Sequence, residues 1–188
     1  MKTKDLALIA LFAALISVLA QISIPLPFSP VPITGQVLGV VLAGAILGRN
    51  KGTLAIIVYL LMGAIGLPVF AQGGSGLAAF VKPSGGYLWG FVLGVYAMGL
   101  ILEMGKKEVG YLRLVISMFV CLMVVYLFGT LQLIYVLQLT PIKGFLLGVA
   151  PYIALDIAKI LLGAAVSYRV RNALQQAGYI KYSGLGSN

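Results

Sequence analysis

Six apolar stretches, joined by short polar connections, follow one another along this chain. They cover residues 5–24, 36–48, 53–67, 85–103, 112–132 and 144–171. A helix satisfies its own backbone hydrogen bonds inside lipid, and about 20 apolar residues cross the hydrocarbon core. We therefore predict an all-α membrane protein, a bundle of six transmembrane helices. The second and third stretches are shorter than this, so we expect them to extend into their flanks or to lie beside a thinner, water-accessible part of the bundle.

The composition supports a membrane protein of one domain. Hydrophobic residues make up 61% of the 188 residues and charged residues only 9%, whereas soluble domains carry about 25% charged residues. The length suits a single transmembrane domain over residues 1–182, followed by a short C-terminal tail at 183–188. The net charge of +9 does not indicate nucleic-acid binding, because the basic residues stand in short clusters between apolar stretches.

Several classes of site are excluded by the residue types that the chain lacks. It contains no histidine and one cysteine, Cys121, which lies in an apolar stretch. Histidine-based zinc sites, Ser-His-Asp triads and disulfide frameworks are therefore excluded. No phosphate-binding GxxxxGK motif occurs, so we expect no ATP binding by this chain, no cofactor and no metal. Any energy input must come from a partner or an ion gradient.

The basic residues alternate between connections, and this pattern predicts the orientation. Ten of them lie on one side of the predicted bundle: Lys2, Lys4, Arg49, Lys51, Lys106, Lys107, Arg113, Arg169, Arg171 and Lys181. Only Lys82 and Lys143 lie in the opposite connections. Because positively charged loops stay on the cytoplasmic side, we predict that both termini are cytoplasmic.

The outer connections are then residues 25–35, 69–84 and 133–143. The first has four prolines, which bar a helix and stiffen it toward an extended or polyproline form. The second is rich in glycine, which lets the backbone approach a neighbour closely. Both are too long and too apolar to be simple hinges, so we expect them to fold back over the bundle as a lid.

The last apolar stretch carries an acid and a base three residues apart, Asp156 and Lys159. This spacing places both side chains on one helical face. A charge in hydrocarbon is costly, so the pair is expected to face the protein interior or a cavity, and it is the first candidate for a ligand site. The alternative is that the two charges only neutralise each other and fix helix packing.

Other polar and aromatic residues fall near the same level of the bundle. At about 1.5 Å per residue, Asp156 lies about 18 Å along the helix axis from its outer start near Gly144, and Pro151 is a residue that can kink the helix on the way. Gln36 and Tyr87 begin two other stretches at the outer side, and Tyr152 lies one turn before Asp156. These side chains can converge on one outward-facing pocket beneath the lid.

Small residues recur at four-residue spacing, which allows helices to approach closely in lipid. Ala10 and Ala14 lie on the first stretch, which has almost no polar group to place inside the protein. This stripe is therefore available for docking to a separate membrane protein. For Gly86, Gly90 and Gly94 we favour packing within the bundle.

Four motifs resemble those of the BioY family, the biotin-binding S subunits of energy-coupling factor (ECF) transporters. They are VPITGQ at 31–36, GLPVF at 66–70, PSGGYL at 83–88 and DIAK at 156–159. The resemblance implies a six-helix subunit of a prokaryotic plasma membrane that captures biotin on its outer side. It also implies a partner module of one transmembrane coupling protein and two cytoplasmic ATPases, which alone use ATP. Ala10 and Ala14 match the stripe that meets the coupling protein, and Asp156 and Lys159 match the ligand-contacting pair.

The ligand that this resemblance implies suits the predicted pocket. Biotin offers two ureido N–H donors and a carbonyl acceptor, apolar rings and an anionic tail. Asp156 can accept the ureido N–H bonds, and Lys159 or Lys82 can hold the carbonyl or the carboxylate. We expect the remaining contacts from Gln36, Ser84 and the backbone of Gly73 and Gly74, with Tyr87 and Tyr152 packing against the rings.

Two other functions compete with this one. A stand-alone secondary transporter or facilitator for a small carboxylate would work without ATPases. However, Asp156 is the only acid clearly buried in a predicted span, and ion coupling normally uses several polar groups. An intramembrane enzyme using Asp156 as acid or base lacks a second carboxylate, a histidine and a metal cluster. We therefore predict a non-enzymatic vitamin-uptake subunit.

Overall fold

The computed structural model describes residues 2–104 and 109–177, which are mostly helical. Their elements in chain order are α1 (Thr3–Gln21), β1 (Ser23–Leu26), β2 (Ser29–Thr34), α2 (Gln36–Ala64), η1 (Ala71–Gly73), α3 (Ala78–Val81), α4 (Gly85–Glu103), α5 (Tyr111–Leu137), α6 (Pro141–Gly148) and α7 (Ile153–Gln176). Lys106, Lys107, Lys181 and the predicted tail at 183–188 lie outside the described residues.

Four of the described helices, α1, α2, α4 and α5, are long and apolar enough to cross a membrane. Together, α6 and α7 form a fifth candidate, a broken span bent by 52°. Large apolar side chains cover much of the outer surface, among them Leu11, Leu127 and Ile142. Such a surface is expected where lipid surrounds the protein. The chain is therefore a multi-pass membrane protein with four or five candidate spans, whereas the sequence predicted six.

The difference in the number of spans arises at α2, where the predicted second and third stretches join. Gly48 has φ 80° and ψ −178°, a conformation that glycine adopts easily and other residues avoid, and the helix breaks there. A Cβ on Gly52 would lie 2.8 Å from the Cα of Gly44. This short distance between residues on either side of the break shows that the two halves fold against each other. The two stretches thus form one interrupted element without an intervening loop.

The proline-rich connection 25–35 is a β-hairpin, so the prediction of an all-α protein is wrong in this detail. β1 and β2 pair antiparallel, with Ser23 opposite Thr34 and Ile24 opposite Ile33. Proline lacks a backbone N–H and is tolerated at sheet edges, and both strands of a two-stranded sheet are edges. The segment is extended, as its prolines favour, but its pairing into a hairpin was not predicted.

The connection between α5 and α6 is much shorter than the predicted outer loop at 133–143. Apolar residues continue past the expected helix end, and α5 runs to Leu137. Only residues 138–140 separate it from α6, which begins at Pro141, a residue well suited to the first position of a helix. This connection therefore adds a short helix beside the hairpin.

The predicted last stretch, 144–171, is also divided. It spans the end of α6, a turn that contains Pro151, and most of α7. The bend of 52° between the two helices places Asp156 in the first turn of α7. The chain thus bends at Pro151, where the sequence suggested a kink, and the acid lies at the N-terminus of a new helix.

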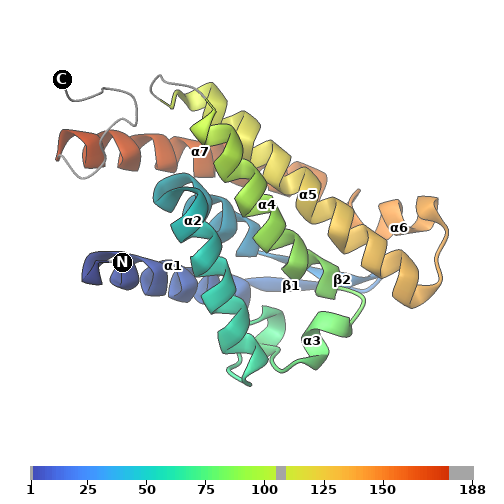
Figure 1. Cartoon of the computed structure of the whole chain (residues 1–188). Helices are drawn as coiled ribbons and strands as arrows, with labels where there is room; N and C mark the ends of the chain where they lie inside the picture. The colour runs from blue at the N-terminus through green and yellow to red at the C-terminus, as the bar shows by residue number, and fades with distance from the viewer. Residues whose placement is uncertain (1, 105–108, 178–188) are drawn as a thin grey trace.

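The helices α4 and α5 pack along each other (Figure 1). Gly86, Gly90 and Gly94 of α4 form the contact: a Cβ on Gly90 would lie 2.8 Å from the Cα of Val125, and one on Gly94 would lie 2.9 Å from the Cys121 carbonyl oxygen. The stripe is used for packing within the bundle, as predicted.

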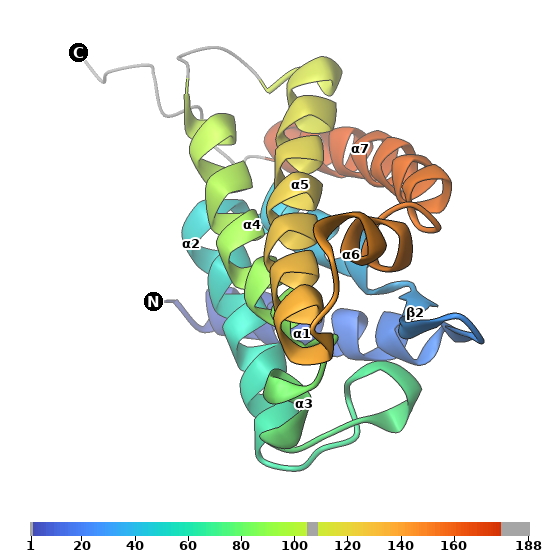
Figure 2. The ribbon, with the colours of Figure 1, turned by 90° about the vertical axis from the view of Figure 1, so that its right-hand side faces the viewer.

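The molecule has two distinct ends. Figure 1 shows the N-terminal end of α1 and the C-terminal end of α7 on the same side, and Figure 2 looks at the opposite end, where the hairpin, α3 and α6 gather. Ionic contacts link helices away from the hairpin: Lys51 with Asp5 at 2.6 Å, and Arg49 with Glu103 at 3.2 Å. The described basic residues of α2 thus join the start of α1 and the end of α4.

Candidate functional site

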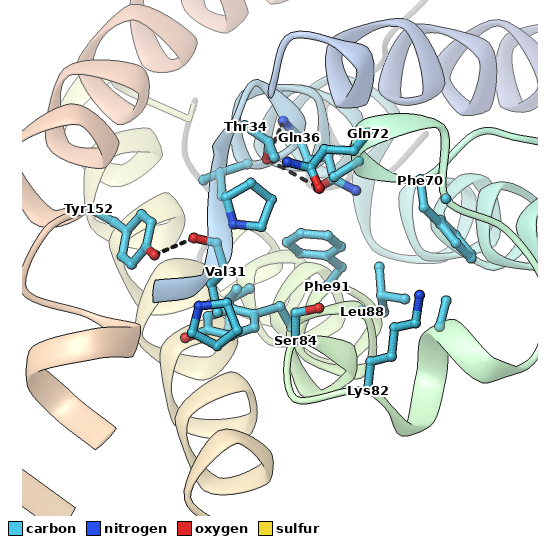
Figure 3. Close-up of a pocket in the computed structure, with 18 of the residues that line it drawn as sticks. Val31, Thr34, Gln36, Phe70, Gln72, Lys82, Ser84, Leu88, Phe91 and Tyr152 are labelled. Carbon is cyan, nitrogen blue, oxygen red and sulfur yellow. Dashed lines mark hydrogen bonds between the residues drawn. The ribbon is translucent and has the colours of Figure 1, made fainter. Parts of the chain in front are cut away.

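A cavity of about 300 Å³ lies beneath the hairpin and the segment that joins α2 to α4, which we call the cap segment (residues 66–84) (Figure 3). Its wall combines apolar side chains with polar and charged ones, and polar groups that converge on a cavity are typical of small-molecule sites. The lining residues are Pro30, Val31, Pro32 and Thr34 of the hairpin; Gln36 and Val37 of α2; Phe70, Ala71, Gln72, Gly74, Ala79, Lys82 and Ser84 of the cap segment; Tyr87, Leu88 and Phe91 of α4; Val125 and Tyr126 of α5; and Tyr152, Asp156 and Lys159 at the start of α7.

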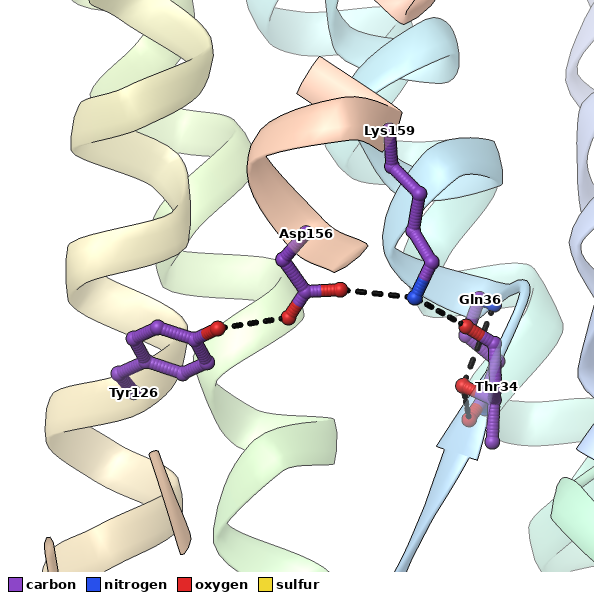
Figure 4. Close-up of polar contacts among 5 residues, drawn as sticks. All are labelled: Thr34, Gln36, Tyr126, Asp156 and Lys159. Carbon is purple, nitrogen blue, oxygen red and sulfur yellow. Dashed lines mark hydrogen bonds and ion pairs between the residues drawn. The ribbon is translucent and has the colours of Figure 1, made fainter. Parts of the chain in front are cut away.

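The predicted acid–base pair is formed, and it lies at the cavity wall. Asp156 is only 3% exposed. Its Oδ1 accepts a hydrogen bond from Lys159 Nζ at 2.7 Å, and its Oδ2 accepts one from the Tyr126 hydroxyl at 2.7 Å (Figure 4). The positive end of the α7 dipole further favours a negative charge in this turn. A buried carboxylate is tolerated when it is paired and hydrogen-bonded in this way.

Lys159 connects this pair to the hairpin and to α2. Its Nζ also donates to the Thr34 carbonyl at 2.7 Å. The Thr34 hydroxyl donates to Gln36 Oε1 at 3.1 Å, and Gln36 Nε2 donates to the Tyr59 hydroxyl at 2.5 Å. Tyr126, Asp156, Lys159, Thr34 and Gln36 thus form a continuous polar chain across α5, α7, β2 and α2 (Figure 4), which Tyr59 extends within α2.

The polar chain keeps hydrogen-bonding capacity for a ligand. Each Asp156 carboxylate oxygen accepts one hydrogen bond from another described side chain although it has two lone pairs. Lys159 uses two of its three ammonium hydrogens. The site can therefore accept and donate hydrogen bonds at adjacent atoms, which suits a ligand that carries N–H groups next to a carbonyl.

Tyr87 and Tyr152 line the cavity with their rings, while their hydroxyls are engaged elsewhere. The Tyr152 hydroxyl donates to the Val31 carbonyl at 2.5 Å and lies 2.9 Å from the Ser29 hydroxyl, which fixes the hairpin to the start of α7. The Tyr87 hydroxyl donates to the Gly148 carbonyl at 2.7 Å, at the end of α6. Tyr152 therefore holds the hairpin over the cavity and Tyr87 holds the end of α6 against α4, while both rings form part of the wall.

The cap segment contributes Lys82, Ser84 and Gly74 to the wall, as the sequence suggested, but Gly73 is not a lining residue. The backbone is left-handed at Gln72 and Gly73, with φ of 58° and 68°, and it is Gln72 that lines the cavity. Lys82 extends from the cap segment along the side of the cavity that Leu88 also lines (Figure 3). The two predicted lid segments thus cover the same space.

Sequence reasoning missed several lining residues. Tyr126 lies in an otherwise apolar helix, where an aromatic residue looks like ordinary core, and nothing in its spacing links it to Asp156 thirty residues later. Thr34 acts through its backbone carbonyl, which any residue type supplies. Phe70, Gln72 and Phe91 lack a periodic signal. The one sequence signal for these residues was the hydroxyl of Tyr126, a polar group within an apolar stretch.

The small-residue stripe of α1 lies on the surface. Ala10 and Ala14 are exposed, whereas Ala13 and Ile16 on the opposite side of the helix are fully buried. This face has no described neighbour in the monomer. Its assignment as a docking surface remains a prediction.

The fold and the cavity define a class of protein: a multi-pass helical membrane protein with an internal cavity whose wall contains a buried ion pair. The comparison with protein families then identifies the family within this class. The model of the BioY family matches residues 1–176. The chain belongs to the BioY family.

Similar proteins carry transporter names. The probable biotin transporter BioY of Pyrococcus horikoshii is 40% identical over 171 residues, which are 91% of this chain and 98% of the relative. The biotin transporter BioY of Thermotoga maritima is 40% identical over 162 residues, 86% of this chain and 92% of the relative. These relatives are transporters and not enzymes, in agreement with the prediction.

A solved structure shares the fold. The crystal structure at 2.1 Å of the S-component for biotin from an ECF-type ABC transporter superposes with a TM-score of 0.85. It is 27% identical in sequence, and the match covers 92% of this chain and 95% of that chain. The arrangement of helices described above is therefore that of an S-component.

Proposed function

We propose that this chain is the S subunit of an ECF-type importer and that its cavity binds biotin. The observation that carries the proposal is the buried Asp156–Lys159 pair, held by Tyr126 at the wall of a cavity of about 300 Å³. The names of the relatives, which are biotin transporters, support the same ligand.

The polar chain matches the ureido ring of biotin. A cyclic urea presents two N–H donors beside one carbonyl acceptor. The remaining lone pairs of Asp156 can accept the N–H groups, and the remaining ammonium hydrogen of Lys159 can donate to the carbonyl. Because the carboxylate is fixed by Tyr126 on one side and by Lys159 on the other, it needs little rearrangement to bind the ligand.

The rest of the cavity suits the apolar and anionic parts of biotin. Val31, Phe70, Leu88 and Phe91 provide apolar wall for the thioether ring and the chain. Lys82 Nζ has no hydrogen bond or ion pair to another described residue, so its charge is available to the carboxylate tail.

The remaining predicted contacts belong to the same proposal. Gln36, Ser84 and the backbone of Gly74 are placed to contribute polar contacts, and Tyr87 and Tyr152 to pack against the rings. Gly73 lies next to the wall and contributes through the shape of the turn.

The proposal extends to topology and partners. We place both termini in the cytoplasm, with six membrane segments when the two halves of α2 are counted separately and residues 1–182 as one domain. The hairpin and the cap segment then face outward. The exposed Ala10–Ala14 face of α1 docks to the coupling protein, whose two ATPases supply the energy, so this chain itself uses no ATP and no cofactor.

A calorimetric titration of the detergent-solubilised chain tests the ligand assignment. We expect saturable binding of one biotin per chain and weaker binding of biotin methyl ester, which lacks the anionic tail. No saturable heat with biotin would contradict the proposal.

A further inference from the structure

The cap segment has little regular structure of its own. Between α2 and α4 it contains only η1 and α3, of 3 and 4 residues. Nevertheless it supplies seven residues to the cavity wall. Its internal backbone hydrogen bonds are local turn contacts, such as those from Phe70 N–H to the Gly74 carbonyl at 3.0 Å and from Phe80 N–H to the Leu77 carbonyl at 3.1 Å. A segment built of turns also needs contacts with its neighbours to stay in place, and such segments open at low cost when those contacts are weak. The residues that fasten it therefore bear on how a ligand enters and leaves.

Gln21, the last residue of α1, fastens the beginning of the cap segment. Its Nε2 lies 3.3 Å from the Pro68 carbonyl and 3.2 Å from the Phe70 carbonyl, and it also contacts the Ser17 carbonyl at 3.3 Å. The Phe70 ring that follows is buried and packs edge-on against Tyr59 at 5.5 Å between ring centroids. This contact thus holds a lining residue in place.

Gln132 of α5 fastens the end of the cap segment in the same way. Its Nε2 donates to the Phe80 carbonyl and to the Lys82 carbonyl, both at 2.8 Å. A Cβ on Gly85 would lie 2.7 Å from this nitrogen, so a glycine at that position leaves room for the amide. A primary amide offers two N–H groups on one nitrogen, which is what two neighbouring carbonyls require.

The two contacts form a matched pair. In each, a glutamine side chain from a membrane helix bridges two carbonyls that are two residues apart, one pair near each end of the cap segment. Neither glutamine lines the cavity. They therefore act on the ligand site only through the position of the cap segment.

We propose that Gln21 and Gln132 are positioning residues that hold the cap segment closed, and that loss of their bonds to the cap carbonyls admits or releases the ligand. The inference rests on the proposed function for the identity of that ligand, and it makes no use of a contact between the glutamines and biotin. Because the bonds close the cavity for entry and for exit alike, their removal speeds both.

The test replaces each glutamine by methionine, which has similar length and no N–H donor, in Gln21→Met and Gln132→Met. Gln138→Met is the matched control, since Gln138 Nε2 donates to the Tyr135 carbonyl at 2.7 Å, outside the cap segment. We measure association and dissociation of radiolabelled biotin and the melting temperature of each variant. The expected result is a rise of at least fivefold in both rate constants for the two cap variants, and none for the control.

A second readout needs no ligand. Val125 lies at the cavity wall and is 1% exposed. In a Cys121→Ala background, Val125→Cys is modified by a small water-soluble thiol reagent only when the cap segment opens. We expect Gln21→Met and Gln132→Met to raise the modification rate severalfold.

The outcomes separate the two proposals. Modification and dissociation rates that stay at the control value, or that change only in proportion to a lowered melting temperature, overturn the role of the glutamines. If the unaltered protein fails to bind biotin while the modification rates rise as expected, the ligand assignment fails and the role of the glutamines stands.

Discussion

Asp156 is a charged side chain in the interior of a membrane protein, and its two donors explain how it is kept there. Replacing it by asparagine removes the charge and turns one accepting oxygen into a donor that faces Lys159 or Tyr126. We predict that Asp156→Asn weakens biotin binding at least tenfold, about 1.4 kcal/mol. Calorimetry measures the change, and an unaltered affinity removes Asp156 from the site.

Tyr126 orients the same carboxylate. Its replacement tests whether that orientation contributes to the affinity for biotin. Tyr126→Phe keeps the ring, which is 6% exposed, and removes only the hydroxyl that donates to Oδ2. Because this hydrogen bond is already made without ligand, its loss affects binding only through the orientation of the carboxylate, so we expect a loss of affinity that is measurable but smaller than that of Asp156→Asn. Tyr135→Phe, at a side chain that is 77% exposed, is the control and should bind normally. Equal affinities for Tyr126→Phe and the control would show that the hydroxyl does not matter for binding.

At the scale of elements, the contact between α4 and α5 depends on the absence of side chains. Gly90→Ala places a Cβ 2.8 Å from the Val125 backbone, and overpacking of this kind costs about 1–3 kcal/mol. Gly110→Ala is a matched control, since a Cβ there meets nothing within 4 Å. We predict that only Gly90→Ala lowers the melting temperature, by several degrees. Similar temperatures for both variants would argue against close packing at this glycine.

The elements also show how far sequence reasoning extends. Apolar length located the parts of the chain that form the long helices, because lipid requires it, although α2 was predicted as two stretches and α6 and α7 as one; the prolines of 25–35 indicated an extended segment. The reversal after Gly48 lies where the sequence placed the boundary between its second and third stretches, but hydropathy did not show that one helix continues through it. Pro151 indicated a kink before Asp156, but hydropathy did not predict a separate helix α6 or the size of the bend. The position of the hairpin over the bundle involves a hydrogen bond from Tyr152 to Val31, two residues that are far apart in sequence.

The candidate site, too, was predicted from the sequence only in part. Asp156 and Lys159 were identified because ionisable residues in an apolar run are costly and rare. Tyr126 and the Thr34 carbonyl were missed, because one resembles core and the other has no side-chain signal. Gly73 was included for its glycine-rich context, although the wall is formed by its neighbours Gln72 and Gly74.

At the scale of the whole molecule, the exposed stripe of α1 distinguishes an S subunit from a stand-alone transporter. Ala10→Leu and Ala14→Leu fill the surface where we expect the coupling protein, and neither residue lines the cavity. We predict that the variants keep their affinity for biotin and lose ATP-dependent accumulation in proteoliposomes that contain the complete transporter. Accumulation by the isolated chain along an ion gradient, without ATPases, would favour the stand-alone alternative.

The account as a whole depends on what occupies the cavity next to Asp156 and Lys159. Native mass spectrometry of the chain, purified in detergent from cells supplied with biotin, identifies the occupant directly. We predict one bound molecule with the mass of biotin in the unaltered protein and its loss in Asp156→Asn. A protein that carries a different small molecule, or that keeps biotin equally well without the carboxylate, would contradict the central claim.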